Sequence, residues 1–202
     1  MISVKIDENQ LQYVINGLKH IKDGAPRAIS QAINRSLTHM RQIVVEEVTT
    51  QYFVRQSEMR NLIEIEPSYR TTLNGRIFLE GKPTPLIKFD LNKRRLASVK
   101  PRKKKKSKLQ PLTVAVMRNG GKKTINGAFV NQTKSGYMGV FRRSTDARYP
   151  LAQLYGPSIP QMAQNLLVSD SVQEKGASYF FKRLEHEVNR INRLPDDKVL
   201  GV

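Results

Sequence analysis

The sequence contains no cysteine and no long apolar run, and each absence excludes a class of protein. Without cysteine the chain can form neither disulfides nor thiolate metal sites, which fits a reducing cytoplasm. Nowhere do about 18 apolar residues follow one another, and residues 1–8 contain no apolar signal core. We therefore expect a soluble protein with no membrane partner.

Acidic residues are absent from a long stretch in the middle of the chain. Between Leu91 and Thr145 there are 16 Lys and Arg and no Asp or Glu, so this stretch carries +16 of the chain's formal net charge of +18. The other residues together carry only +2, the balance of an ordinary near-neutral domain. The charged stretch is expected to attract polyanions, of which phosphate backbones are the commonest.

The positive charge is densest in residues 92–110. Like charges repel and little in this segment can be buried, so we expect a mobile loop inserted between strands. The candidate contacts to nucleic acid or to an acidic partner are Lys100, Arg102, Lys103, Lys104, Lys105, Lys106 and Lys108. Flexible lysines act as point charges, so such binding would be independent of base sequence and lost at high salt. A solvated loop that only raises the charge is the other interpretation, and both stay open.

Residues that could catalyse a reaction are not grouped in the sequence. The three histidines, His20, His39 and His186, fall on expected helices without a partner at metal-ligand spacing. The stretch 116–124 is only partly similar to a phosphate-binding loop, because Val116 and Lys123 occupy the positions of its glycine and its Ser/Thr. We expect no catalytic residue, no metal and no cofactor, and hence no enzyme. A magnesium-dependent nuclease and a general nucleic-acid-binding protein are the competing classes.

Two long amphipathic helices are predicted. Apolar residues spaced three or four apart place the first at about Pro26 to Gln51; they are Ile29, Ile33, Leu37, Met40, Val44 and Val48. The second helix is expected to begin at Ser171, which forms a capping box with Glu174, and to end before Pro195.

Strand patterns fill much of the remaining chain. Ile63–Glu66 alternates, and Tyr69–Leu73 is expected to form a hairpin with Arg76–Leu79. Pro85–Phe89 has the character of an edge strand, and a second hairpin joins residues 127–130 to 136–143. Helices at both ends predict a single α+β domain over residues 1–202, an antiparallel β-sheet packed with a long N-terminal-half helix and a C-terminal helix.

Residues 125–162 carry a resemblance to a known family. The order G-A-F at 127–129, G-x-x-G-V-F-R-R at 136–143 and L-x-x-L-Y-G-P-S-I-P-Q-M at 151–162 resembles the minor tail protein Z family of tailed bacteriophages and prophages. Two further blocks, at residues 81–89 and 25–35, support it. The resemblance covers most of the chain.

The resemblance implies a structural tail-completion protein at the head-proximal end of the tail. Such a protein would lie in the virion tail after assembly in the host cytoplasm, contact other tail or neck proteins, make the tail competent to join heads and help to position DNA. Related head–tail connector proteins suggest a homo-oligomeric ring. The candidate interface residues are Arg142, Arg143, Tyr155, Gly156 and Pro157. In the alternative interpretation they form a strand end and a tight turn before a helix capped by Ser158.

Overall fold

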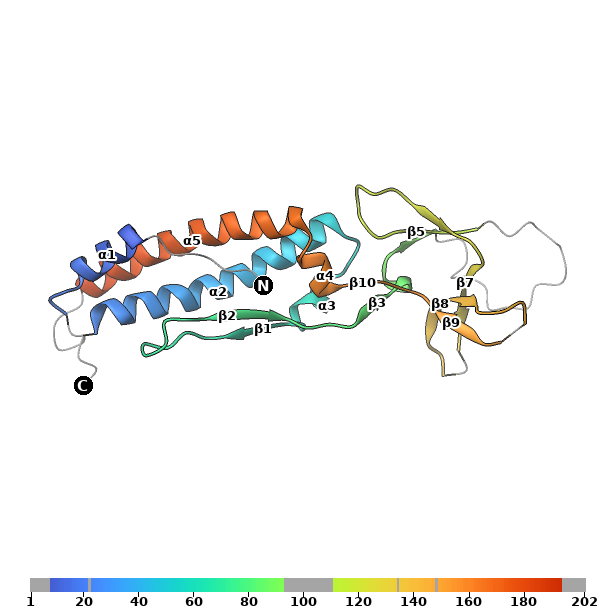
Figure 1. Ribbon diagram of the computed structural model, residues 1–202, viewed down its shortest axis with the longest axis horizontal. Helices are drawn as coiled ribbons and strands as arrows, with labels where there is room; N and C mark the ends of the chain where they lie inside the picture. The colour runs from blue at the N-terminus through green and yellow to red at the C-terminus, as the bar shows by residue number, and fades with distance from the viewer. Residues whose placement is uncertain (1–7, 22, 93–110, 134, 148, 194–202) are drawn as a thin grey trace.

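The computed structural model describes residues 8–21, 23–92, 111–133, 135–147 and 149–193. Figure 1 shows an elongated molecule with a bundle of helices at one end and small sheets at the other. The predicted α+β class is confirmed, with the strands divided among four small antiparallel sheets.

Two long helices lie side by side and form the body of the bundle (Figure 1). α2, Gly24–Gln51, follows the predicted bounds, and its apolar stripe is largely buried. α5, Leu166–Asn192, packs along it. The shorter helices are α1, Glu8–Gly17, α3, Gln56–Arg60, and α4, Ile159–Ala163.

The predicted start of the last helix at Ser171 is wrong, because α5 begins five residues earlier, at Leu166. The carbonyl of Asn165 accepts hydrogen bonds from the N–H groups of Val168 and Ser169, which begins the helix there. The Asn165 amide also donates to the hydroxyl of Tyr52, at the end of α2, over 2.9 Å. A contact between residues far apart in sequence therefore decides the boundary.

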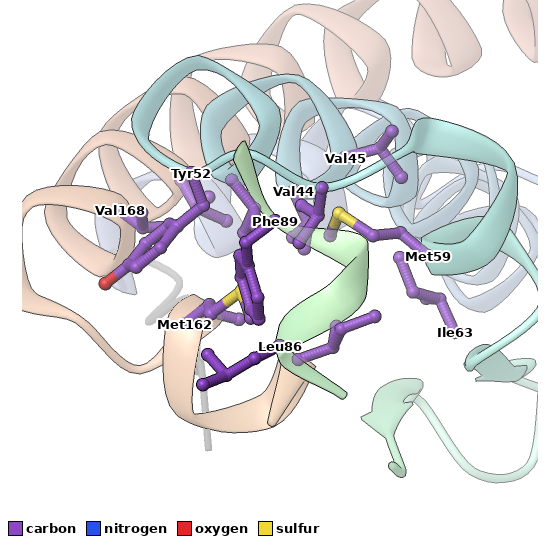
Figure 2. Packing of buried hydrophobic residues seen from close by; sticks show 14 of the residues in the cluster. Val44, Val45, Tyr52, Met59, Ile63, Leu86, Phe89, Met162 and Val168 are labelled. Atoms are coloured by element: carbon purple, nitrogen blue, oxygen red, sulfur yellow. The ribbon is translucent and has the colours of Figure 1, made fainter. Parts of the chain in front are cut away.

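The apolar side chains form two clusters along the helix pair. The first lies where the C-terminal half of α2 meets α4, the beginning of α5 and the strands, and Figure 2 shows Phe89, Leu86 and Met162 packed together there. The second joins α1 to the beginning of α2 and the end of α5. Burial of each such side chain contributes about 1.5–3 kcal/mol relative to exposure.

A hairpin of β1, Ile63–Glu66, and β2, Arg76–Leu79, runs along α2 (Figure 1). The expected pairing of Tyr69–Leu73 with β2 is wrong, since residues 67–75 form the connecting loop. The pairing of β1 with β2 puts four apolar side chains on one face, and a strand at Tyr69–Leu73 has no such alternation.

The tip of this hairpin is fastened to α2 through buried Ser68. The Asn34 amide donates to the Ser68 carbonyl over 2.9 Å and accepts from the Ser68 N–H over 2.7 Å. The Ser30 hydroxyl donates to the same carbonyl over 3.0 Å. The hairpin is thus held to the helix at its tip as well as at its base.

Substitution Asn34→Ala is expected to release the hairpin tip, because it removes both hydrogen bonds to the Ser68 backbone. We expect a loss of about 1–2 kcal/mol in the free energy of local opening. Hydrogen exchange and protease cleavage within residues 67–75 measure it, with the exposed Gln42→Ala on the same helix as control. Unchanged protection of the loop would contradict this role of Asn34.

The remaining strands are short and lie mainly at the other end of the molecule (Figure 1). They are β3, Pro83–Pro85; β4, Asp90–Leu91; β5, Leu112–Ala115; β6, Lys123–Ile125; β7, Ala128–Gln132; β8, Met138–Arg143; β9, Leu151–Gln153; and β10, Tyr155–Ser158. They pair as β4–β5–β6, β7–β8–β9 and β10–β3, so the predicted hairpin of residues 127–143 is confirmed. The predicted edge strand at Pro85–Phe89 is wrong, because the strand is Pro83–Pro85 and a 3-10 turn at Leu86–Lys88 then buries Leu86 and Phe89 together.

Candidate interaction surfaces

The two residues that flank the lysine-rich segment lie next to each other in the fold. Its flanks, Asn92 and Pro111, lie where β4 and β5 pair. The Asn92 amide donates to the Pro111 carbonyl over 3.3 Å, and its oxygen accepts from the Thr113 N–H over 3.2 Å. The flanks are therefore held side by side. The seven candidate contact residues between Lys100 and Lys108 lie outside the described residues.

Arg142 is connected to these flanks through two strand pairings. Leu112, which follows the segment, pairs with Ile125, and the chain then turns at Gly127 into Ala128, which pairs with Arg142. Gly127 has φ of 71°, a conformation that favours glycine, and Cγ of Arg142 lies 3.8 Å from where a β-carbon would be. Arg142 is exposed and makes no ion pair with any described residue. Its charge is therefore available to a partner of opposite sign.

Arg143 lies on the opposite face of the same sheet, because neighbouring residues in a strand alternate. Its guanidinium carbon is 6.0 Å from the centre of the Phe129 ring. On that face Gln153 donates a hydrogen bond to the hydroxyl of Tyr137. Tyr155, two residues after Gln153 and in the next strand, is 51% exposed. We call these five residues the tyrosine face. The sequence grouped Arg142 with Arg143, whereas the structure separates them.

Gly156 and Pro157 lie in strand β10, in place of the alternative tight turn. A β-carbon on Gly156 would lie 2.6 Å from Cε2 of Phe89, a buried ring of the first cluster. Glycine at this position lets the ring reach the strand. Pro157 is half-buried.

The expected helix cap at Ser158 is confirmed. Its hydroxyl accepts from the N–H of Gln161 over 3.4 Å, and the Gln161 side chain accepts from the Ser158 N–H over 2.8 Å. The five interface candidates therefore fall into three places: Arg142 on one face of β8, the tyrosine face on the other side, and a strand that packs on the core.

A buried carboxylate lies between the long helices, and the sequence did not single it out. Glu187 is 1% exposed and accepts hydrogen bonds from Arg183 at 2.8 Å and Arg190 at 2.7 Å, with Arg35 of α2 at 3.4 Å. Burial alone would raise the pKa of Glu187, but the hydrogen bond and charge of Arg190 and the charges of Arg183 and Arg35 hold it below 4.5. His186 lies 3.9 Å from this carboxylate, so one histidine does approach an acid.

This cluster had a partial signal in the sequence. Arg183 and Arg190 lie four and three residues from Glu187, a spacing that puts all three on one helix face. The burial of the carboxylate depends on α2, whose Gln31 also accepts from Arg190. We assign the cluster to holding the two helices in register.

A groove of about 540 Å³ lies between the hairpin and the helices. It is lined mainly by apolar side chains, among them Leu37 and Met40 from α2 and Ile77 from β2. Within the described ranges, no three His, Cys, Asp or Glu side chains gather closely enough to hold a metal ion. No helix in the described part of the chain combines the length and apolar character needed to cross a bilayer.

Comparison with known proteins places these surfaces on a structural component of a phage tail. Residues 10–195 match the family described as prophage minor tail protein Z (GPZ), and the chain belongs to this family. No curated protein and no solved structure matches the chain. Membership places the protein in the tail of a virion, in contact with other tail proteins.

Proposed function

We propose that the protein is a tail-completion subunit that acts at the head-proximal end of the tail and makes the tail competent to join heads. Its partners there are other tail or neck proteins and further copies of itself arranged in a ring. It is assembled into the tail in the host cytoplasm. Its action is adhesion by shape and charge, without bond chemistry.

The observation that carries the proposal is the arrangement of the exposed residues on an elongated subunit of this family. The ion pairs of Glu187 with Arg35, Arg183 and Arg190 hold α2 and α5 together. A rigid helix pair of this kind is suited to a subunit that forms the wall of an assembly. The other end carries strands β7–β9 (Figure 1), where Arg142 and Arg143 of β8 are exposed and Tyr137, just before β8, is 42% exposed. A ring of such subunits would add their weak contacts together without any new interaction.

The experiment is removal of the gene from a phage or inducible prophage, followed by electron microscopy of the lysate. We expect separate DNA-filled heads and tails of normal length, with joining restored when the wild-type chain is supplied in trans. A chain carrying the exposed substitution Glu185→Gln should restore it equally. Joined, infectious particles in the absence of the chain would refute the proposal, as would a complete lack of tails.

Contact with DNA is the second candidate, supported by the excess positive charge between Leu91 and Thr145 and by the exposed Arg142, which makes no ion pair with any described residue. Seven phosphate contacts by the candidate residues would make log K fall with log salt at a slope of about −6. Deletion of residues 100–108 separates the two functions. Loss of DNA retention with normal tail assembly favours a nucleic-acid role, whereas unchanged particles favour the structural role alone.

A further inference from the structure

The edge of β2 that faces away from β1 has no partner strand among the described residues. The carbonyl of Leu62 accepts a hydrogen bond from the N–H of Glu80 over 3.2 Å, one pair beyond the β1–β2 register. Bonding alternates along an antiparallel pair, so Phe78 also bonds towards β1. The backbone N–H and carbonyl groups of Ile77 and Leu79 therefore point to the other edge, which is a template for a further strand.

This unpaired edge borders the groove between the hairpin and the helices. The groove is lined by the whole of β2, Arg76–Leu79, and by no described residue of β1. The helices contribute the apolar stripe of α2 from Ile33 to Val44 and Phe180 of α5. The apolar side chains of β2 are only half-buried there. A strand added to this edge would cover the apolar lining of the groove.

α1 leads into one end of the groove. Ile33 and Phe180 line the groove, and both also pack in the second cluster with Val14 of α1. The connection from Leu18 to Gly24 is short and holds backbone hydrogen bonds, so α1 runs back along α2 (Figure 1). Its ten residues, at 1.5 Å each, bring the start of α1 about 15 Å along α2, to the level of Ile33.

Residues 1–7, which precede α1, have the pattern that this edge requires. They lie outside the described residues, and their sequence alternates as in a half-buried strand, with Ile2, Val4 and Ile6 between Ser3, Lys5 and Asp7. At about 3.3 Å per residue, residues 2–6 span about 16 Å, which is about the length of α2 from Ile33 to Val44. The segment therefore has the length of the groove as well as an apolar face to cover it.

The direction of β2 fixes the direction of pairing. A β-carbon on Gly75, just before β2, would lie 2.9 Å from Ile33, and one on Gly81, two residues after β2, would lie 3.3 Å from Pro160 of α4. β2 thus runs along the groove away from α1. A segment that enters α1 from the groove runs the other way, so its pairing with β2 is antiparallel, the commoner kind.

We propose that the unpaired edge of β2 and the groove beside it are the docking site of the chain's own residues 2–6. These residues add a third strand, with Ile2, Val4 and Ile6 over the groove. Because α1 tethers the segment at the end of the groove, its docking is intramolecular and has the advantage over a strand from another chain. The added strand also covers an edge that would otherwise pair with other chains.

Hydrogen exchange followed at single amides by NMR tests the docking. The N–H groups of Ile77 and Leu79 should exchange slowly in the isolated wild-type chain, because the added strand accepts their hydrogen bonds. Val4→Asp places a charge over the groove and should speed their exchange at least about tenfold, while the N–H of Phe78, which faces β1, stays protected. Lys5→Asp places the same charge on the outer face and is the matched control. Rapid exchange of Ile77 and Leu79 in the wild type would overturn the proposal, as would equal effects of the two variants.

A disulfide gives a second measurement and identifies the source of the strand. Because the chain lacks cysteine, Phe78→Cys with Lys5→Cys introduces only two thiols, at neighbouring outward positions of the proposed pairing. Phe78→Cys with Ser3→Cys covers the register shifted by two residues. We expect one of the two pairs to give an oxidised monomer without free thiols, and the exposed control Asn16→Cys with Phe78→Cys to stay reduced. Disulfide-linked dimers in place of the monomer would overturn the proposal, because the strand would then come from a second copy, and so would the lack of a disulfide in both registers.

Discussion

Substitution Glu187→Gln is expected to lower the free energy of unfolding by about 3 kcal/mol. Glu187 is 1% exposed and is the carboxylate that Arg183, Arg190 and Arg35 share at the α2–α5 contact. Breaking a buried ion pair by removing one partner typically costs about 3–5 kcal/mol, because the remaining charges lose their compensation. Part of that cost is recovered here because the arginines are partly exposed to solvent.

Urea unfolding followed by far-UV circular dichroism measures this loss. The control is Glu185→Gln on the same helix, an exposed position where we expect a change within about 0.5 kcal/mol. Equal stability of the two variants would show that the arginine cluster contributes nothing to holding the helices together.

The same carboxylate gives the effect a pH dependence of known sign. The pKa of Glu187 in the folded protein lies below 4.5, the value for the free group. Its stabilisation is therefore fully present above about pH 4.5 and is lost as the pH falls through the folded pKa. The stability difference between wild type and Glu187→Gln should shrink in acid. A difference that stays constant down to strongly acidic pH would mean that the ionised carboxylate is not its source.

Substitution Gly156→Ala is expected to cost about 2 kcal/mol in the isolated chain. The added methyl group would lie 2.6 Å from Cε2 of Phe89, whose ring is 5% exposed in the first hydrophobic cluster. Overpacking of this kind forces a ring or a strand to move and costs about 1–3 kcal/mol. The ring cannot turn away freely, because Leu86 and Met162 pack around it (Figure 2).

Thermal unfolding of the isolated chain measures this effect. Gly17→Ala is the control, because its nearest contact would be Val188 at 3.7 Å and alanine favours the helix. Its stability should be unchanged or slightly raised. A Gly156→Ala chain that is as stable as the wild type but fails to enter particles would instead assign this glycine to an interface.

Much of the fold could be predicted from local patterns. The stripe from Ile29 to Val48 predicted α2 with nearly its observed bounds, and the hairpin of β7 and β8 followed from two apolar runs around a polar turn. The cap at Ser158 also followed, because a serine before a proline and a glutamine has a local reason to begin a helix. In each case the residues that decide the structure lie within a few positions of one another.

The errors occurred where distant contacts decide between local options. Ser171 has good capping chemistry, yet α5 begins at Leu166, after Asn165 meets Tyr52 at the end of α2. β2 pairs with β1 and leaves Tyr69–Leu73 as a loop, because that pairing packs one apolar face on α2. A pattern read along the sequence ranks alternative strands and helix starts by local propensity alone. It does not include the surface of the distant segment against which each would pack.

The candidate surfaces divide in the same way. The positive charge and the family blocks are visible in the sequence, and so are the residues chosen from them. The sequence could not show that Arg142 and Arg143 lie on opposite faces of the β7–β8–β9 sheet, with Arg143 on the tyrosine face. Strand alternation and pairing decide that separation.

The α+β class, the long helix α2, the family and the placement of excess positive charge all follow from the chain's residues alone, because each depends on composition or on short-range patterns. Long-range packing, in contrast, buries Glu187 among arginines and brings the ring of Phe89 against Gly156. These features arise where segments distant in the chain meet, and burial and electrostatic pairing exist only after they have met.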